Sequence, residues 1–355
     1  MDYSDTPGEP KCRVRTLILV SLTLLLSMST WFSASAVLPQ IREAWNLSSA
    51  ASTWLTIAVQ LGFVVGAVVS SLINLSDILS PRYVILVGAT GSALANLFIN
   101  MTAQPAVGIA LRFATGFFLA GVYPPAFKFI STWFQKGRGM ALGVLAAALV
   151  LGNGIPHLIN GLGGLNWHIV ITITSAMTVV GGLIAAFALR EGPYPFPRAI
   201  FDPKQAGKVF TNKGVWLASL GYIGHMWELF ALYAWFAVFI GSVLSHRGWP
   251  GNTSAAFATF AIFMTGSLGS WAGGVIADRW GRMKTTILMM AISGTCALVI
   301  GLLIDAPIWI LLLVSLVWAF AFLAPGPAVG ILAILRLKHL DKIKLIAKDT
   351  GKQLP

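Results

Sequence analysis

The sequence predicts an all-α membrane protein built as a helical bundle. Of its 355 residues, 57% are hydrophobic and 10% are charged, whereas a soluble domain carries roughly 25% charged residues. The apolar residues gather in long stretches, and about 20 such residues let an α-helix cross a hydrocarbon core about 30 Å thick. This composition excludes a soluble globular enzyme.

Ten stretches are long and apolar enough to count as spans. They cover residues 15–38, 51–74, 83–102, 106–130, 139–160, 168–189, 214–243, 254–276, 285–304 and a last one that begins at 306. The first follows three basic residues, as a secretory signal peptide does, but it is too long for one and lacks a small-residue cleavage site. We therefore expect it to be retained as the first span.

The basic residues predict the orientation, because positive loops stay in the cytoplasm. With the N-terminus inside, the cytoplasmic segments hold 20 of the 24 Lys and Arg residues, and the opposite side holds only Arg42 and Arg247. Topology thus explains the net charge of +12, which gives no support for a nucleic-acid partner. We expect a multi-pass protein of the plasma (cell inner) membrane with both termini in the cytoplasm.

One polar stretch, residues 190–213, divides the chain, and it contains four prolines and five basic residues. The expected organisation is a cytoplasmic leader (1–14), a six-helix N-terminal bundle (15–189), this central loop (190–213), a C-terminal bundle of about four helices (214–337) and a basic cytoplasmic tail (338–355). Six spans followed by a similar series is the layout of transporters built from two six-helix repeats.

A run of glycine and charged residues follows the eighth span, on a predicted short cytoplasmic loop. It reads Gly274-Val-Ile-Ala-Asp278-Arg279-Trp-Gly281-Arg282-Met-Lys284. Gly281 permits a tight turn, and Asp278 can accept hydrogen bonds from the exposed N–H groups at the start of the next helix. The three basic residues hold the loop inside and can pair with the acid.

This run resembles the loop signature of the major facilitator superfamily, roughly G-x-x-x-D-R-x-G-R-x-K/R, and matches it at every position. The family repeats the signature after its second span, where this chain keeps Asp77 and Arg82 but neither glycine. The fourth span reads Arg112-Phe-Ala-Thr-Gly116-Phe-Phe-Leu-Ala-Gly121, similar to the family's R-x-x-x-G-x-x-x-A-G pattern. The resemblance, over residues from about 15 to 305, implies two pseudo-repeats whose signature loops control a conformational change.

Two branches of the family are not favoured. The fifth span has Gly152-Asn-Gly-Ile-Pro-His157 where drug/proton antiporters carry a G-x-x-x-G-P-x-x-G-G-like stretch. Residues 51–74 and 254–276 contain no Arg, whereas nitrate and nitrite porters use one in each of these spans.

Glu228 is the only acid within any span, and an ionisable group in a bilayer is by default a candidate site. On one helix His225, Glu228 and Trp235 lie within about 80° of one face, and we expect this stripe to line a central cavity. Glu228 can hold a proton or balance a cation, and His225 can relay the proton. The alternative is a structural Glu bonded to its own helix or to a neighbour.

The fourth span supplies Arg112 and Tyr123, which lie with Gly116 within about 40° of one helix face. The family resemblance places this Arg near the cavity, where it can pair with Glu228 or bind an anionic solute. A purely structural pairing is the alternative.

The fifth span supplies Asn153 and His157, four residues apart on one face. They can offer polar contacts to a solute, although a kink at Pro156 whose freed carbonyl is satisfied locally explains them equally well. Trp31 and Gln60 are weaker candidates, because an aromatic or amide group in a bundle more often packs or bridges helices.

The last apolar stretch, residues 306–337, would be about 48 Å long as one helix, too long for a straight crossing. Pro325-Gly326-Pro327 interrupts it. The family implies twelve spans where we count ten, so we expect the start of span ten to be joined to the end of span twelve, leaving the second bundle incomplete.

These observations predict a secondary active transporter, a symporter or uniporter, for a small polar or anionic solute. It would work by alternating access as a monomer in the lipid bilayer, coupled to a proton or solute gradient. The alternative is a shortened, transport-incompetent member with a structural or interaction role. The sequence contains no G-x-S-x-G, H-E-x-x-H or phosphate-binding G-x-x-x-x-G-K-[ST] pattern, so we expect no enzyme activity, cofactor or metal site.

Overall fold

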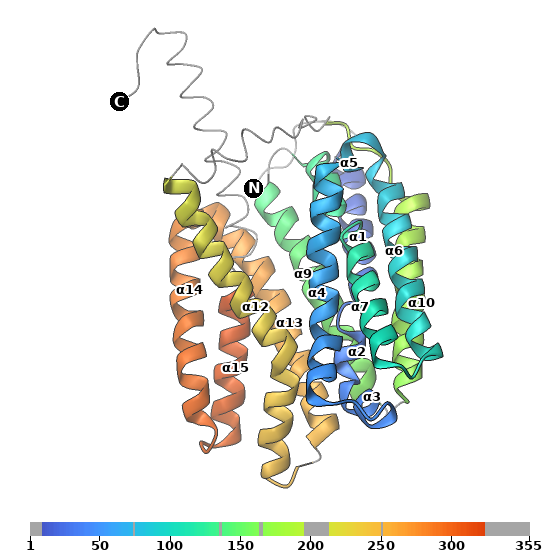
Figure 1. Ribbon diagram of the computed structural model, residues 1–355. Coiled ribbons are helices and arrows are strands. Elements are labelled where there is room, and N and C mark those ends of the chain that lie inside the picture. The colour runs from blue at the N-terminus through green and yellow to red at the C-terminus, as the bar shows by residue number, and fades with distance from the viewer. Residues whose placement is uncertain are drawn as a thin grey trace.

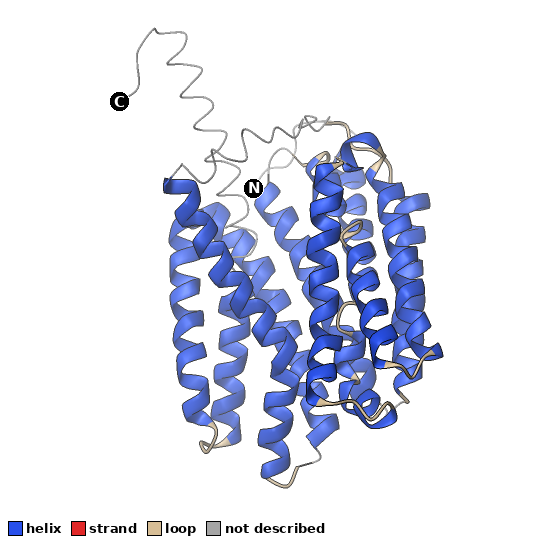
Figure 2. Ribbon diagram, viewed as in Figure 1, coloured by secondary structure: helices blue, strands red, loops and turns tan. Residues whose placement is uncertain are grey.

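The computed structural model describes residues 9–73, 75–134, 137–162, 166–194, 213–249 and 251–323. Over these residues the chain forms helices and no β-strand (Figure 2), which confirms the all-α prediction. The long helices run side by side, with α5 (Leu75–Ile78) at one end of the bundle and α3 (Leu38–Ala44) at the other (Figure 1). We call these the α5 end and the α3 end.

The first group of helices ends at residue 188. It comprises α1 (Glu9–Met28), α2 (Ser33–Ala36), α3, α4 (Ser49–Leu72), α5, α6 (Pro81–Leu97), η1 (Phe98–Met101), α7 (Pro105–Leu119), α8 (Tyr123–Ser131), α9 (Arg138–Gly161) and α10 (Trp167–Ala188). Within it α4 packs on α7, while α10 packs on both α1 and α6. Gly62 and Gly116 bring α4 and α7 so close that a Cβ atom at either glycine would overlap the backbone of the other helix.

The second group comprises α12 (Lys213–His246), α13 (Gly251–Trp280), α14 (Arg282–Val299), η2 (Ile300–Leu303) and α15 (Ile308–Leu323). In it α13 packs against α12 and α15. The same helix also packs along α9 of the first group, so the α9–α13 pair joins the two groups.

Eight helices of the described part are long and apolar enough to cross a membrane. The other two predicted spans correspond to α1 and to α15, which is described over Ile308–Leu323. The predicted fourth span, 106–130, agrees with the apolar segment Pro105–Ser131. Inside the predicted first and fourth spans the helix stops, between Met28 and Ser33 and between Leu119 and Tyr123. The second stop has a local cause: two prolines follow Tyr123 and cannot donate to the carbonyls one turn earlier.

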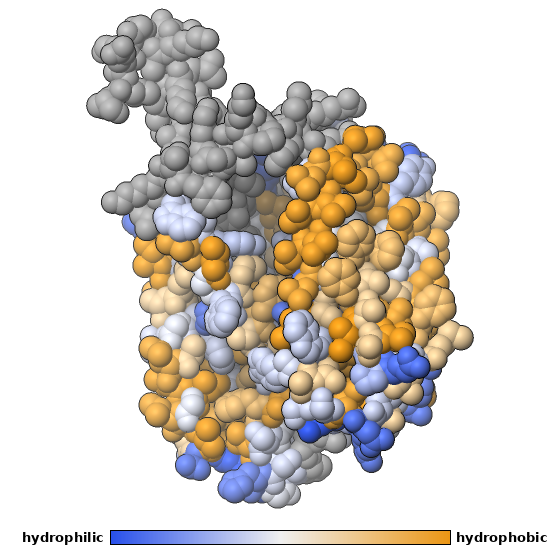
Figure 3. Space-filling view, viewed as in Figure 1, coloured by the Kyte–Doolittle hydropathy of each residue, from blue (hydrophilic) through white to orange (hydrophobic). Residues whose placement is uncertain are grey.

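Apolar side chains cover much of the outer surface, as expected where helices face lipid. Figure 3 shows them gathered over α4, whose exposed apolar residues include Leu61, Val64, Val65, Val68, Val69 and Leu72. Most of the predicted central loop, the Pro325-Gly326-Pro327 break and the basic tail lie outside the described residues.

Candidate transport pathway

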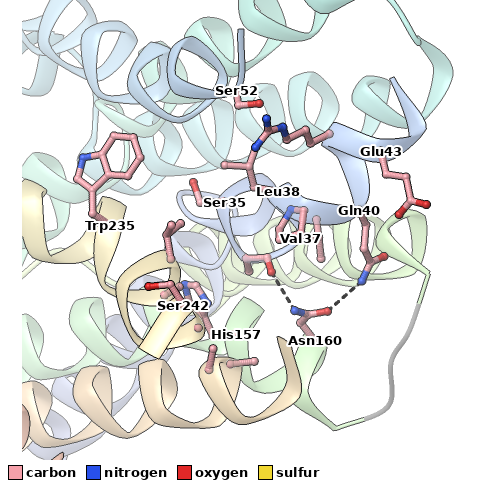
Figure 4. Close-up of a pocket in the computed structure, with 18 of the residues that line it drawn as sticks. Ser35, Val37, Leu38, Gln40, Glu43, Ser52, His157, Asn160, Trp235 and Ser242 are labelled. Atoms are coloured by element: carbon pink, nitrogen blue, oxygen red, sulfur yellow. Dashed lines mark hydrogen bonds between the residues drawn. The ribbon is translucent and has the colours of Figure 1, made fainter. Parts of the chain in front are cut away.

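A cavity of about 1080 Å³ lies at the α3 end, between the two helix groups. Residues from α2, α3, α4 and α9 line one side, and residues from α12 and α13 line the other. Figure 4 shows His157 and Asn160 of α9 in the same space as Ser242 of α12. The cavity is therefore built jointly by both groups.

Most polar residues of the cavity wall are uncharged. They are Ser35, Gln40, Asn46, Ser49, Ser52, Thr53, His157, Asn160, Ser242, Ser245 and Thr253. Asn160 is held in place because its amide nitrogen donates to the carbonyl of Ala36 at 2.9 Å, while Gln40 donates to its side-chain oxygen at 3.3 Å (Figure 4). Two neighbours of opposite charge, Arg42 and Glu43, complete the polar wall.

Six aromatic residues form a connected cluster that meets the cavity residue His157 through Phe263, and we call them the aromatic floor: Trp31, Phe32, Phe63, Phe230, Tyr233 and Phe263. Their ring centroids are 4.4 Å apart for Tyr233 and Phe263 and 5.5 Å apart for Phe32 and Tyr233. Trp31 stacks on Phe230 at 6.2 Å. The floor thus connects the first helix group to α12 and α13.

His157 and Asn153 are both buried, with 2% and 4% of their surfaces exposed. His157 lines the cavity, and its ring stacks on Phe263 at 5.7 Å. Within the described part of the chain, His157 Nε2 and Asn153 Oδ1 have no hydrogen-bond partner. Helix α9 runs through Pro156. A solute contact at both residues stays a prediction, and the unpartnered atoms favour it.

Arg112 lies in α7 and is completely buried. Its guanidinium donates to the carbonyl of Thr30 at 2.9 Å, to the carbonyl of Trp31, and to the side-chain oxygen of Asn96 at 3.2 Å. These carbonyls belong to the stop between α1 and α2, where helical hydrogen bonding is interrupted and the backbone needs other partners. Arg112 therefore makes structural contacts in place of the predicted pairing with Glu228, and its role in binding an anionic solute stays a prediction.

Glu228 and His225 of α12 differ from the predicted cavity stripe. Oε1 of Glu228 accepts hydrogen bonds from Ser293 of α14 at 2.5 Å and from Trp318 of α15 at 2.6 Å. His225 is buried, with its ring 4.8 Å from that of Phe322 on α15. Only Trp235 of the stripe lines the cavity, because ten residues along a helix are about 15 Å and the same face meets different neighbours at its two ends.

Tyr123 begins α8 and contacts the edge of the aromatic floor rather than the cavity. Its ring stacks with that of Phe63 at a centroid distance of 6.0 Å and meets Phe127 edge-on at 4.9 Å. The stop before α8 breaks the regular helical spacing that placed Tyr123 on one face with Arg112.

Asp278 connects the two helix groups at the α5 end. It belongs to the last turn of α13, where a loop was predicted, and its Oδ2 accepts a hydrogen bond from the backbone N–H of Met140 at 3.2 Å. It therefore caps the start of α9 and not the following helix α14. A Cβ atom at Gly274 would lie 2.8 Å from the carbonyl oxygen of Gly139, so the two helices approach closely here.

The other residues of the signature loops lie at the same end. Gly281 is the only residue between α13 and α14, with a φ of 96° that favours glycine. Arg279 and Lys284 are exposed, and the guanidinium of Arg82 lies over the Tyr83 ring at 4.7 Å. The side chains of Asp77 and Arg282 lie outside the described set.

Several residues of the pathway were missed by sequence reasoning. The sequence could have pointed to Asn160 and Gln40 as pathway residues, since Asn160 is one turn from His157 and both amides interrupt apolar stretches. It could also have pointed to Asn96, as an amide within the apolar third span; Asn96 accepts from Ser33 at 2.8 Å and donates to Ser175 at 3.0 Å. It could not have pointed to Tyr233, because aromatic residues are frequent in every span.

Comparison with known proteins agrees with this architecture. The family model described as Major Facilitator Superfamily matches residues 20–341. The chain belongs to the Major Facilitator Superfamily. It is thus a multi-pass membrane protein of a transporter family and not an enzyme.

Relatives within the superfamily are distant. An uncharacterized MFS-type transporter, YceJ of Bacillus subtilis (strain 168), is 27% identical over 79% of this chain and 71% of its own length. The uncharacterized transporter ESBP6 of Saccharomyces cerevisiae is 28% identical over 50% of this chain, and the match spans about a quarter (27%) of the yeast protein. A bacterial homolog of the human lysosomal transporter Spinster, in an inward-facing and unoccupied conformation, has a TM-score of 0.69 and 17% identity over 91% of this chain and 75% of that one. At this identity the structural likeness concerns the fold alone.

Proposed function

We propose that the chain is a secondary active transporter that carries a small polar solute through the cavity by alternating access. The observation that carries the proposal is the cavity itself, because both helix groups line it and most of its polar residues are uncharged. A site between two bundles can be exposed to either side of a membrane by rocking one bundle against the other.

The two bundles in this proposal are residues 15–189 and 214–337. The contact at the α5 end supports such a movement, since the side chain of Asp278 in one bundle accepts a hydrogen bond at 3.2 Å from the start of α9 in the other. In the transport cycle this contact breaks and re-forms. The present arrangement, with the cavity at the α3 end and the aromatic floor behind it, is then one of two alternating states.

Charge supports the orientation. Arg82, Arg138, Arg279 and Lys284 belong to the helix starts and ends at the α5 end, whereas Arg42 lies at the α3 end. Because Lys and Arg concentrate on the cytoplasmic side, we assign the α5 end and both termini to the cytoplasm of a plasma-membrane protein.

Proton coupling is the energy source that the chain supports best. Glu228 lies near the middle of α12 and bonds to α14 and α15, so a change in its protonation alters the packing among three helices. An intramembrane acid with this kind of setting is a functional candidate.

The test is uptake by the purified, full-length chain in proteoliposomes, with a panel of labelled neutral and anionic solutes and an imposed pH gradient. Transport predicts saturable uptake that collapses when the gradient is dissipated by an ionophore. Empty liposomes and the heat-inactivated protein are the controls. Uptake of no solute by correctly inserted protein would favour the alternative, a transport-incompetent member with an interaction role.

The cavity is tested independently by cysteine labelling. In a background with Cys12→Ser and Cys296→Ala, which removes the chain's two free cysteines, Ser242→Cys should react with a membrane-impermeant maleimide added on the α3 side. A cysteine at Ser315, which is buried in α15, is the matched control and should not react.

A further inference from the structure

Two charged groups lie in the middle of the bundle, the buried Arg112 and the half-buried Glu228, and both are engaged in structural contacts. Arg112 donates to the backbone of the α1–α2 stop and to Asn96, and it does not line the cavity. Glu228 accepts from Ser293 and Trp318 within the second helix group. Lys128 lies in the last turn of α8. Neither Arg112 nor Lys128 lines the cavity, so an anionic solute there would not meet either of these two cations.

Several buried polar atoms of the described residues have no partner, and they include Nε of Arg112, whose other guanidinium nitrogens are bonded, as well as four groups on other residue types. Within the described part of the chain, Trp31 Nε1, Asn153 Oδ1, His157 Nε2 and the Tyr233 hydroxyl are buried and have no hydrogen-bond partner. Their side chains are 2% to 6% exposed. A buried polar group without a partner destabilises the fold, so these four groups need an explanation.

Three of these side chains, Trp31, His157 and Tyr233, lie against the rings of Phe32 and Phe263. Phe32 lies 6.3 Å from Trp31 and 5.5 Å from Tyr233, measured between centroids. Phe263 lies 4.4 Å from Tyr233 and 5.7 Å from His157. Asn153 is one turn from His157 on α9 and shares its face. The set therefore lies in and beside the aromatic floor, and His157 connects it to the cavity.

The four side chains can both donate and accept hydrogen bonds without carrying a charge. The indole N–H is a donor, the amide oxygen is an acceptor, and the phenol and the imidazole nitrogen can serve as either. The surrounding rings add apolar faces. This combination fits a solute that carries hydroxyl or amide groups together with an apolar face.

We propose that the solute is uncharged and bears hydroxyl or amide groups, and that Trp31, Asn153, His157 and Tyr233 bind it behind the cavity. The proposal rests on the proposed transport function and narrows its substrate class by excluding anions. The buried polar atoms of the set find their hydrogen-bond partners when the solute enters. Arg42 and Glu43 remain at the cavity wall, where their opposite charges give an anion no net attraction.

Paired solutes test the charge preference. Purified full-length protein in detergent is titrated with uridine and uridine 5′-monophosphate, with D-glucose and D-glucose 6-phosphate, and with glycerol and glycerol 3-phosphate, and binding is followed by thermal shift. The neutral member of at least one pair should bind at least about 10-fold tighter than its phosphate. Tyr233→Phe and Asn153→Ala should each weaken that binding about 5-fold, the loss of one hydrogen bond. Tyr222→Phe, on the same helix at a partly exposed position, is the matched control and should bind normally.

A second measurement needs no ligand. If the Tyr233 hydroxyl is reserved for a solute, Tyr233→Phe leaves the melting temperature of the ligand-free protein unchanged or higher. Asn96→Ala, which removes an amide bonded to Ser33, Arg112 and Ser175, should lower it clearly. If no solute of the panel binds, this comparison decides: an unchanged or raised melting temperature supports the proposal, and a loss equal to that of Asn96→Ala overturns it.

Equal or tighter binding of the phosphate member also overturns the proposal, as does binding that Tyr233→Phe and Asn153→Ala do not change. Uptake into proteoliposomes tests the transport function separately from the proposal that the solute is uncharged. Uptake of an anion would support the transport function and contradict the proposal that the substrate is uncharged. Tight binding of a neutral solute without uptake would support the four-residue binding site and contradict the transport function.

Discussion

Replacing Arg112 by methionine should destabilise the fold and not simply weaken solute binding. Methionine keeps much of the volume of the side chain but none of its donors. The carbonyls of Thr30 and Trp31 and the side-chain oxygen of Asn96 would then each lose a hydrogen bond inside the bundle. The stop between α1 and α2 would lose the group that holds it.

The magnitude follows from these three contacts. A buried acceptor left without its donor costs about 1–3 kcal/mol, whereas hydrogen bonds between membrane helices average about 0.6 kcal/mol because the unfolded chain finds other partners. Three such losses give about 2 kcal/mol at the membrane average and about 3–9 kcal/mol at the cost of unpaired buried acceptors, and we expect about 2–5 kcal/mol because the protein lies in a membrane. At roughly 2–4 °C for each kcal/mol, the melting temperature should fall by about 10 °C.

The assay is thermal unfolding of the purified protein in detergent, followed by the intrinsic tryptophan signal and by size-exclusion chromatography. Arg82→Met is the matched control, because Arg82 lies at the first turn of α6 and contacts the Tyr83 ring, and its loss should cost about 0.5 kcal/mol or less. If Arg112→Met kept the melting temperature of the parent protein while abolishing uptake of an anion, Arg112 would be a binding residue and the structural reasoning would be refuted.

Three further predictions concern the helix contacts and the coupling. Glu228→Gln should preserve the fold, because the amide oxygen can still accept from α14 and α15, yet remove the pH dependence of uptake; unchanged pH dependence would exclude Glu228 as the coupling acid. Asp278→Ala should weaken the contact with the start of α9 by about 1 kcal/mol or less and change the labelling rate of Ser242→Cys, and an identical rate would show that this contact does not govern opening. Gly116→Leu should lower the melting temperature strongly, because even a Cβ there overlaps the α4 backbone, and a normal melting temperature would mean that α4 and α7 are not this close.

The helical bundle could be predicted because the membrane imposes a simple rule on the sequence. About 20 apolar residues are needed for each crossing, so α4, α6, α9 and α10 begin and end within a few residues of the predicted spans. The stops inside the first and fourth spans escaped this rule, since hydropathy averages over a break. The local signals were present as Ser29 and Thr30 in one span and as two adjacent prolines in the other.

The candidate site was predicted less well because it depends on partners far away in the sequence. The proposal that Asn153 and His157 face the pathway needed only their spacing on one helix. The partners of Arg112 and Glu228 depend on which helices lie beside them, and helix spacing alone carries no such information. Asp278 shows the same limit, because its hydrogen bond goes to Met140, 138 residues away.

Counterflow in proteoliposomes tests the central claim most directly. Vesicles containing the purified chain are loaded with a high concentration of the unlabelled neutral solute that binds best and are diluted into a trace of the labelled form, with no ion gradient. A site that alternates between the two sides predicts a transient accumulation of label above its equilibrium level, which Tyr233→Phe reduces and Tyr222→Phe leaves intact. Label that never rises above equilibrium, in vesicles whose protein still binds the solute, would contradict alternating access through this cavity.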